Sequence, residues 1–83
     1  MKLSATQRLL LSRLTNEGAT ITAMRSPPYR VRENQPGDPT LGRVIRQDTF
    51  SALREHGLVE KFDDRRFINL YRITDKGREA LKQ

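Results

Sequence analysis

Two adjacent arginines, Arg65 and Arg66, stand in the short polar segment "DDRR" between two stretches of strand-like composition. This pattern predicts a β-hairpin with both guanidinium groups at its tip. A guanidinium binds phosphate oxygens and base edges with two parallel hydrogen bonds, which an ammonium group cannot do. The hairpin tip at 62–67 is therefore expected to contact a polyanion, with narrow A·T-rich minor grooves of duplex DNA as a suitable target. The competing interpretation is a solvated turn in which Asp63 and Asp64 neutralise the arginines, a pairing of little energetic value.

A second polar group lies on and just before a predicted helix at 48–56. Its members are Arg46, Gln47, Thr49, Ser51 and Arg54. In the major groove arginine binds guanine and glutamine binds adenine, while hydroxyl groups suit phosphates. The opposing interpretation is an ordinary solvated helix face, because Asp48 and Glu55 leave this segment without net charge.

A third group surrounds the irregular segment "SPPYRVRENQPGDP". It consists of Arg25, Arg30, Arg32 and Arg43, which would add phosphate contacts. The stiff tip formed by Pro27, Pro28 and Tyr29 could instead bind a protein partner. An ordinary surface is an equally good interpretation of these residues.

The composition favours a polyanionic partner, with nucleic acid first. The chain of 83 residues carries a net charge of +6, and 12 of its 16 basic residues are arginine. It contains no cysteine, so neither disulfides nor thiolate zinc sites are available, which suits a reducing compartment. The only histidine, His56, falls at a helix C-terminus, where its cation would suit the helix dipole. No cofactor, metal site or catalytic group is expected, and the chain is not predicted to be an enzyme.

No apolar run approaches the length of a membrane span. The first apolar stretch is interrupted by Arg8 and Arg13, which argues against a secretory signal. A cytoplasmic protein without a membrane contact is expected.

The first half of the chain predicts one helix and one hairpin. Ser4 and Gln7 form a capping box and Gly18 suits a C-terminal cap, so the helix is expected over about 5–17. The β-branched segment 19–24 predicts a strand. A return strand is expected at 29–33, with the bend at 26–28 and a loop at 34–40.

The helix at 48–56 has clear signals at both ends. Asp48 is expected to be its N-cap residue. Gly57 falls where the left-handed residue of a Schellman motif belongs, followed by an apolar contact between Leu58 and Leu53. A longer helix that begins at Asp38 and runs through Leu41, Val44 and Ile45 ranks second, because Gly42 interrupts it.

The C-terminal third predicts strands at 58–62 and 67–73, followed by a short helix capped by Thr74 with Ala80 and Leu81 turned inward. The order of elements predicts an α+β winged helix: a helical core, a recognition helix at 48–56 and a two-stranded wing. We expect residues 1–83 to form a single domain.

The segment from residue 48 to the C-terminus resembles MarR-type transcriptional regulators. PadR-type proteins have turn and helix-cap residues in a similar pattern. The matching residues are Gly57, Leu58, Val59, Asp63, Asp64, Arg65, Arg66, Ile73, Thr74, Gly77 and Leu81. The resemblance implies that the recognition helix and the wing bind double-stranded DNA. It also implies a transcriptional regulator, for which a homodimer on a two-fold site is compatible.

The chain departs from that family in two respects. It has no room for the long terminal helices of MarR-type proteins, and Pro36, Gly37 and Pro39 stand where the helix before the recognition helix belongs. The helix-turn-helix pair is therefore degenerate or replaced by a hairpin. More loosely, the chain is similar to the short YjhX-type family of toxin-like proteins. The alternative function is accordingly a winged-helix scaffold for protein–protein contact, such as a small toxin or a phage-type modulator of host machinery.

Overall fold

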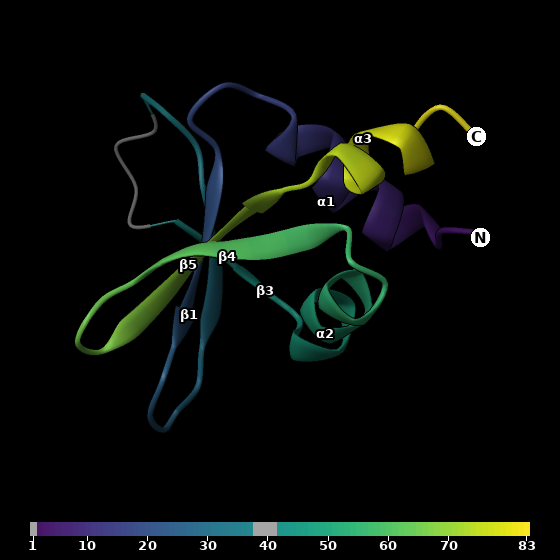
Figure 1. Ribbon diagram of the computed structural model, residues 1–83. Helices are drawn as coiled ribbons and strands as arrows, with labels where there is room; N and C mark the ends of the chain where they lie inside the picture. Colours follow the sequence, from purple (N-terminus) through teal and green to yellow (C-terminus); the bar gives the residue numbers. More distant parts are fainter. Residues whose placement is uncertain (1, 38–41) are drawn as a thin grey trace.

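The computed structural model describes residues 2–37 and 42–83 as an α+β fold with a five-stranded antiparallel sheet and three helices (Figure 1). The elements follow the order α1 (Ala5–Leu14), β1 (Thr20–Met24), β2 (Val31–Asn34), β3 (Arg43–Ile45), α2 (Gln47–Glu55), β4 (Val59–Asp64), β5 (Ile68–Ile73) and α3 (Asp75–Ala80). The α+β class predicted from the sequence is confirmed.

The sheet has the strand order β3-β2-β1-β5-β4, so the first strand lies in its centre. Each neighbouring pair is antiparallel, and Ile21 of β1 faces Tyr71 of β5. The strands alternate between an inner face, which is packed against the helices, and an outer face. The hydrophobic core lies between the inner face and the helices.

The core is built from apolar residues at helical spacing on α1 and α2 and at alternate positions on the strands. Its largest fully buried side chains are Leu10, Leu11, Leu14, Ile21, Leu53 and Leu58. Phe50 of α2 packs edge-on against Tyr71 with ring centroids 4.9 Å apart, an arrangement that aromatic quadrupoles favour. These contacts hold α2 against the centre of the sheet.

Helix α1 begins as predicted but ends three residues earlier. The capping box is present, with the Gln7 amide donating to Ser4 Oγ at 3.1 Å and the Ser4 amide donating to Gln7 Oε1 at 3.1 Å. The helix ends at Leu14 because the Thr15 hydroxyl donates to the Ser12 carbonyl at 2.6 Å, and the Thr15 amide donates to the same carbonyl at 3.3 Å. The predicted end at residue 17 is therefore wrong.

The hairpin of β1 and β2 confirms the predicted return strand. Ile21 pairs with Glu33, and the bend is closed by a hydrogen bond from the Tyr29 amide to the Ser26 carbonyl at 2.9 Å. Asn34, predicted to be in a loop, is the last residue of β2 instead. Residues 38–40 of the predicted loop 34–40 lie outside the described residues.

Strand β3 was not predicted. The alternative prediction of a longer helix through Val44 and Ile45 is wrong, because both residues belong to this strand. Val44 pairs with Arg32 and Ile45 pairs with Val31, so both residues extend the sheet. A strand of three residues carries too little alternation to be recognised, and its hydrogen-bonding partner lies well before it in the chain. The proposed start of that helix, with Leu41, falls among the residues that are not described.

Helix α2 begins one residue before the predicted range and lacks the predicted cap. Arg46 holds the N-cap position without a side-chain cap hydrogen bond, while Asp48 lies in the first turn and pairs with Arg46. A carboxylate there still suits the helix dipole. At the other end, the amides of Gly57 and Leu58 donate to the carbonyls of Arg54 and Leu53 at 3.0 and 2.9 Å. The predicted Schellman motif is therefore confirmed.

The predicted C-terminal hairpin and helix are confirmed with small shifts in their bounds. Strands β4 and β5 pair from Val59 and Ile73 to the tip, with an irregularity between Lys61 and Asp63. Thr74 Oγ1 accepts the Gly77 amide at 3.0 Å and its hydroxyl donates to the Gly57 carbonyl at 2.7 Å. Thr74 thus caps α3 and ties this helix to the end of α2.

Gly77 lets α3 pack directly on the start of β4. A Cβ at this position would press against the Leu58 carbonyl oxygen and lie 2.8 Å from Ile73 Cγ1. We expect Gly77→Ala to destabilise the fold by about 1–3 kcal/mol, since overpacking against backbone outweighs the better helix propensity of alanine. Urea denaturation checks this against Lys76→Ala, an exposed change in the same helix. A stabilised Gly77→Ala variant would contradict the close approach.

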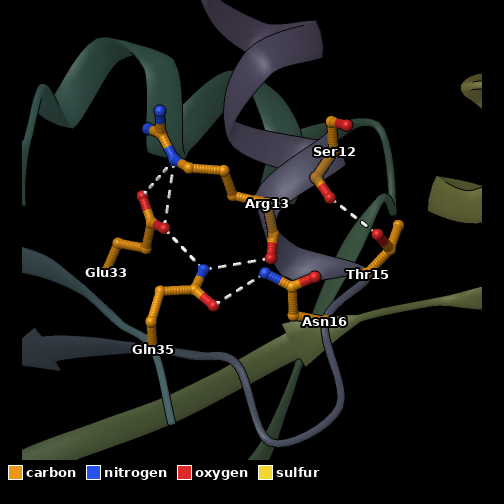
Figure 2. A network of polar contacts seen from close by, with 6 residues as sticks. All are labelled: Ser12, Arg13, Thr15, Asn16, Glu33 and Gln35. Atoms are coloured by element: carbon orange, nitrogen blue, oxygen red, sulfur yellow. Dashed lines mark hydrogen bonds and ion pairs between the residues drawn. The ribbon is translucent and has the colours of Figure 1, made fainter. Parts of the chain in front are cut away.

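A buried ion pair fastens β2 to α1 (Figure 2). Arg13 Nε donates to both carboxylate oxygens of Glu33, at 2.8 and 3.1 Å, and the Glu33 side chain is only 2% exposed. Gln35 Nε2 donates to the same carboxylate at 2.6 Å and to the Arg13 carbonyl at 3.0 Å, while Asn16 Nδ2 donates to Gln35 Oε1. The carboxylate is thereby compensated in charge and in hydrogen bonds, as a buried charge requires.

Candidate nucleic-acid interface

Two hairpins, β1–β2 and β4–β5, project from the body formed by the helices (Figure 1). Their ends are joined by the Arg25 amide, which donates to the Phe67 carbonyl at 3.0 Å. The Arg25 guanidinium donates to the Arg65 carbonyl at 2.9 Å. Because Arg25 uses a neutral carbonyl as its partner, it links the hairpins without losing its positive charge.

The two arginines at the tip of the β4–β5 hairpin lie in solvent. Arg65 contacts Asp63 at 3.4 Å, a long and exposed pair that contributes little. Arg66 lies over the ring of Phe67, 5.4 Å from the centroid, and pairs with no carboxylate among residues 2–37 and 42–83. Both guanidinium groups remain accessible to an anion.

The β1–β2 hairpin adds Arg30 and Tyr29 to this region. The Arg30 carbonyl accepts a hydrogen bond from the Met24 amide at 3.0 Å. The exposed side chain of Arg30 forms no ion pair within the described part of the chain. Tyr29 has a positive φ of 55° and its side chain is 51% exposed. We call Arg25, Arg30, Arg65 and Arg66, with Tyr29 and Phe67, the tip cluster.

Helix α2 adjoins the tip cluster through one of its faces. Gln47 Nε2 donates to the Tyr29 carbonyl at 2.5 Å. Gln47, Ser51 and Arg54 recur at helical spacing and line a shallow groove of about 170 Å³ against Tyr29 and the inner face of β5. This groove therefore connects the helix to the hairpin ends.

Asn69 of β5 is one of the residues that line this groove. Its Oδ1 is buried without a hydrogen-bond partner in the described structure, an uncommon state for a side-chain acceptor.

Not all of the predicted residues belong to this surface. Arg46 and Thr49 line a hollow with Thr6 and Gln7 of α1, on the other side of α2. Arg43 lies opposite Glu33 in the pairing of β2 with β3, and Arg32 points to the outer face with Val44. The structure thus forms two groups that meet at Tyr29: Gln47, Ser51 and Arg54 line the groove along α2, and Arg25, Arg30, Arg65 and Arg66 lie at or beside the hairpin ends. Arg46, Thr49, Arg32 and Arg43 belong to neither group.

The exposed aromatic rings were not recognised from the sequence. Phe67 was assigned to a strand, but it precedes β5 and its side chain is 65% exposed. Its position in the sequence could have indicated this exposure, because Phe67 directly follows Arg65 and Arg66 at a predicted hairpin turn. A large apolar side chain at such a turn lies too far from the core to be buried. Tyr29, predicted to lie in the irregular segment that could bind phosphate or a protein partner, lies beside α2.

The remaining chemistry of the described residues is limited. His56 occupies the C-cap position of α2, as predicted, and is exposed. Across 2–37 and 42–83, no three His, Asp or Glu side chains are grouped so as to hold a metal ion. In the same ranges, no helix has the length and apolar character needed to cross a membrane.

Comparisons of the chain with protein-family models, with curated proteins and with solved structures found no match.

Proposed function

We propose that this protein binds duplex DNA with α2 and an arginine-tipped wing, and that its fold is a winged helix in which a β-hairpin stands in for the first helix of the helix-turn-helix. The observation that carries the proposal is the tip cluster, which gathers exposed guanidinium groups at the ends of the two hairpins. The Tyr29 carbonyl of the same cluster accepts a hydrogen bond from Gln47 of α2. The arginines of the cluster supply positive charge for phosphates, and the neighbouring helix α2 is of a kind that fits the major groove of DNA.

The topology supports this variant of the winged helix. Helix α2 leads into the hairpin β4–β5, and β1 joins that hairpin as a third strand beside β5. Between β1 and α2 the chain forms β2 and β3 instead of a helix. Strand β2 is held to α1 by the ion pair of Arg13 with Glu33. The replacement hairpin is therefore anchored to the same core that positions α2.

The two parts of the surface have different tasks in this proposal. Gln47, Ser51 and Arg54 face the groove beside the tip cluster and are the residues that contact base edges. The guanidinium groups of Arg65 and Arg66 bind phosphates or the adjacent minor groove. Arg46, Thr49, Arg32 and Arg43 lie to the side and have at most phosphate contacts at the margin of the footprint.

Binding to mixed-sequence duplexes over a range of salt concentrations tests the function directly. We expect retardation in a gel-shift assay at micromolar protein and low salt, with an affinity that falls steeply as salt rises, because phosphate contacts release counterions. Selection of bound duplexes from a random pool would then identify the sequence and its symmetry. No retardation at micromolar protein would refute DNA binding.

The wing makes a separate prediction. Replacing both Arg65 and Arg66 by alanine should weaken DNA binding about tenfold or more, since hydrogen bonds to charged groups contribute on the order of 1.5 kcal/mol each. The melting temperature should stay nearly unchanged, because both side chains are outside the core. The control is Arg72→Ala with Arg78→Ala, which removes the same charge near Thr74, away from the tip. Equal losses in both double variants would remove the wing from the mechanism.

A protein partner is the second candidate function, favoured by the outer face of the sheet. Met24, Leu70 and the well-exposed Val44 point to this face, opposite the helices. Such a face suits a partner protein or a second copy of the chain. Under this alternative, Val44→Arg would abolish the association and Arg65→Ala with Arg66→Ala would not, as measured by analytical ultracentrifugation.

The biological setting remains part of the proposal. A DNA-binding module of this kind fits a cytoplasmic transcriptional regulator without a cofactor and without a catalytic site. A homodimer would double the contacts on a two-fold DNA site.

A further inference from the structure

We infer that Phe67 stacks on exposed nucleobases, so that the protein prefers duplexes that contain an unpaired or easily unstacked base. The inference rests on the proposed function, and it adds a base-stacking residue to a surface otherwise made of phosphate-binding groups.

The exposure of Phe67 has no explanation in the packing of the fold. Its side chain is 65% exposed at the tip of β4–β5, where its backbone carbonyl accepts the Arg25 amide. The Arg65 amide also donates to the Ile68 carbonyl at 2.7 Å, so hydrogen bonds hold the backbone of this turn on which the ring is carried. A large apolar ring on a fixed turn is costly in solvent and gains most when it is covered.

The charge around the ring indicates what covers it. Arg66 lies 5.4 Å from the ring centroid, and the Arg25 guanidinium is held at the neighbouring Arg65 carbonyl. Aromatic rings that alternate with guanidinium groups are typical of surfaces on which bases stack while the backbone phosphates are neutralised. Tyr29, on the adjoining hairpin, provides a second exposed ring beside Arg30.

Phe62 on the same hairpin shows the contrast. Both rings have an arginine over them, but Phe62 is 41% exposed and lines a hollow with Leu14 and Ala19 at the other end of the sheet. Phe62 is therefore partly packed against the body of the protein. Phe62 is the matched control for Phe67, because it is a phenylalanine of the same hairpin that lies away from the tip.

A ring carried by a narrow hairpin can reach a base only where the stack is open. Proteins that insert apolar side chains between base steps do so at flexible steps, at the cost of partial unstacking. That cost is smallest where a base is already unpaired. The preference should therefore be largest for a duplex with a bulged base and smaller for a fully matched one.

The test measures binding to two duplexes that differ only by one central bulged thymine. We expect the wild-type chain to bind the bulged duplex about fivefold to a hundredfold more tightly than the matched one, the range of one aromatic–base stack. Phe67→Ala should lose this preference and bind the two duplexes about equally. Phe62→Ala should retain the preference.

A direct optical test is available because the chain contains no tryptophan. Phe67→Trp places a single reporter at the tip, and its fluorescence should be quenched by the bulged duplex, whereas that of Phe62→Trp should not change. A wild-type protein that binds both duplexes equally, or a Phe67→Ala variant that keeps the preference, overturns the inference and leaves DNA binding intact. No binding to either duplex overturns the proposed function and the inference together.

Discussion

Leu53→Ala is expected to destabilise the fold by about 2–5 kcal/mol, the range for removing a buried leucine. The Leu53 side chain has no exposed surface and packs within the core from α2, so truncation leaves a cavity under the sheet. The melting temperature should fall by about 10 °C or more, because a small domain loses roughly 4–8 °C per kcal/mol. Chemical and thermal denaturation measure both quantities.

Leu9→Ala is the matched control for this experiment. Leu9 belongs to α1 and its side chain is exposed, so the same change of residue should alter the stability by only a few tenths of a kcal/mol, as is usual for surface sites. Similar losses in the two variants would show that α2 is not packed on the core as described. The loss in Leu53→Ala would also reduce the proposed DNA binding indirectly, so a binding assay on this variant should be run below its melting temperature.

Arg13→Met is expected to cost about 3 kcal/mol, the lower end of the range for removing one partner of a buried ion pair. The lower end applies because Arg13 is 29% exposed, whereas Glu33 is nearly fully buried and would lose the cation it pairs with. Gln35 would remain its hydrogen-bond donor, at 2.6 Å. Urea denaturation measures the loss.

Restoration by a second change is the sharper test of this pair. Arg13→Met combined with Glu33→Leu should recover most of the lost stability, since apolar residues of similar volume can replace a buried ion pair at little cost. The single variant Glu33→Leu should be less stable than the double variant. If the two single losses simply add, the interaction does not hold β2 to α1 as the geometry indicates.

The same pair explains why part of the fold escaped prediction. Glu33 was placed in a return strand, but nothing in "YRVRE" shows that its carboxylate is buried, since the partner Arg13 is 20 residues earlier. Strand β3 has the same difficulty, because its three residues become a strand only by pairing with β2. Long-range pairs of this kind leave no local pattern.

Many residues of the candidate surface were predicted from the sequence, but their arrangement in space was not. Arg65 and Arg66 were expected at a hairpin tip, and the structure places them there. The sequence grouped Arg46 and Thr49 with Gln47, because all three are neighbours in the chain. On the helix they face different sides: Gln47 points to the tip cluster, and Arg46 and Thr49 point to α1. The helical geometry decides this division, because residues two apart on a helix, such as Gln47 and Thr49, lie on nearly opposite sides of it.

Helix ends and turns could be predicted from the amino-acid sequence wherever their hydrogen bonds join residues close in the chain. The capping box of Ser4 with Gln7, the Schellman motif after Leu53 and the Thr74 cap were all predicted, because each needs only side chains and backbone that are near neighbours in the chain. The five-stranded sheet, the burial of Glu33 and the meeting of two hairpin ends at Arg25 and Phe67 became visible only in the three-dimensional structure. Those features depend on contacts between distant segments, whose free energy is gained only when the whole sheet has formed.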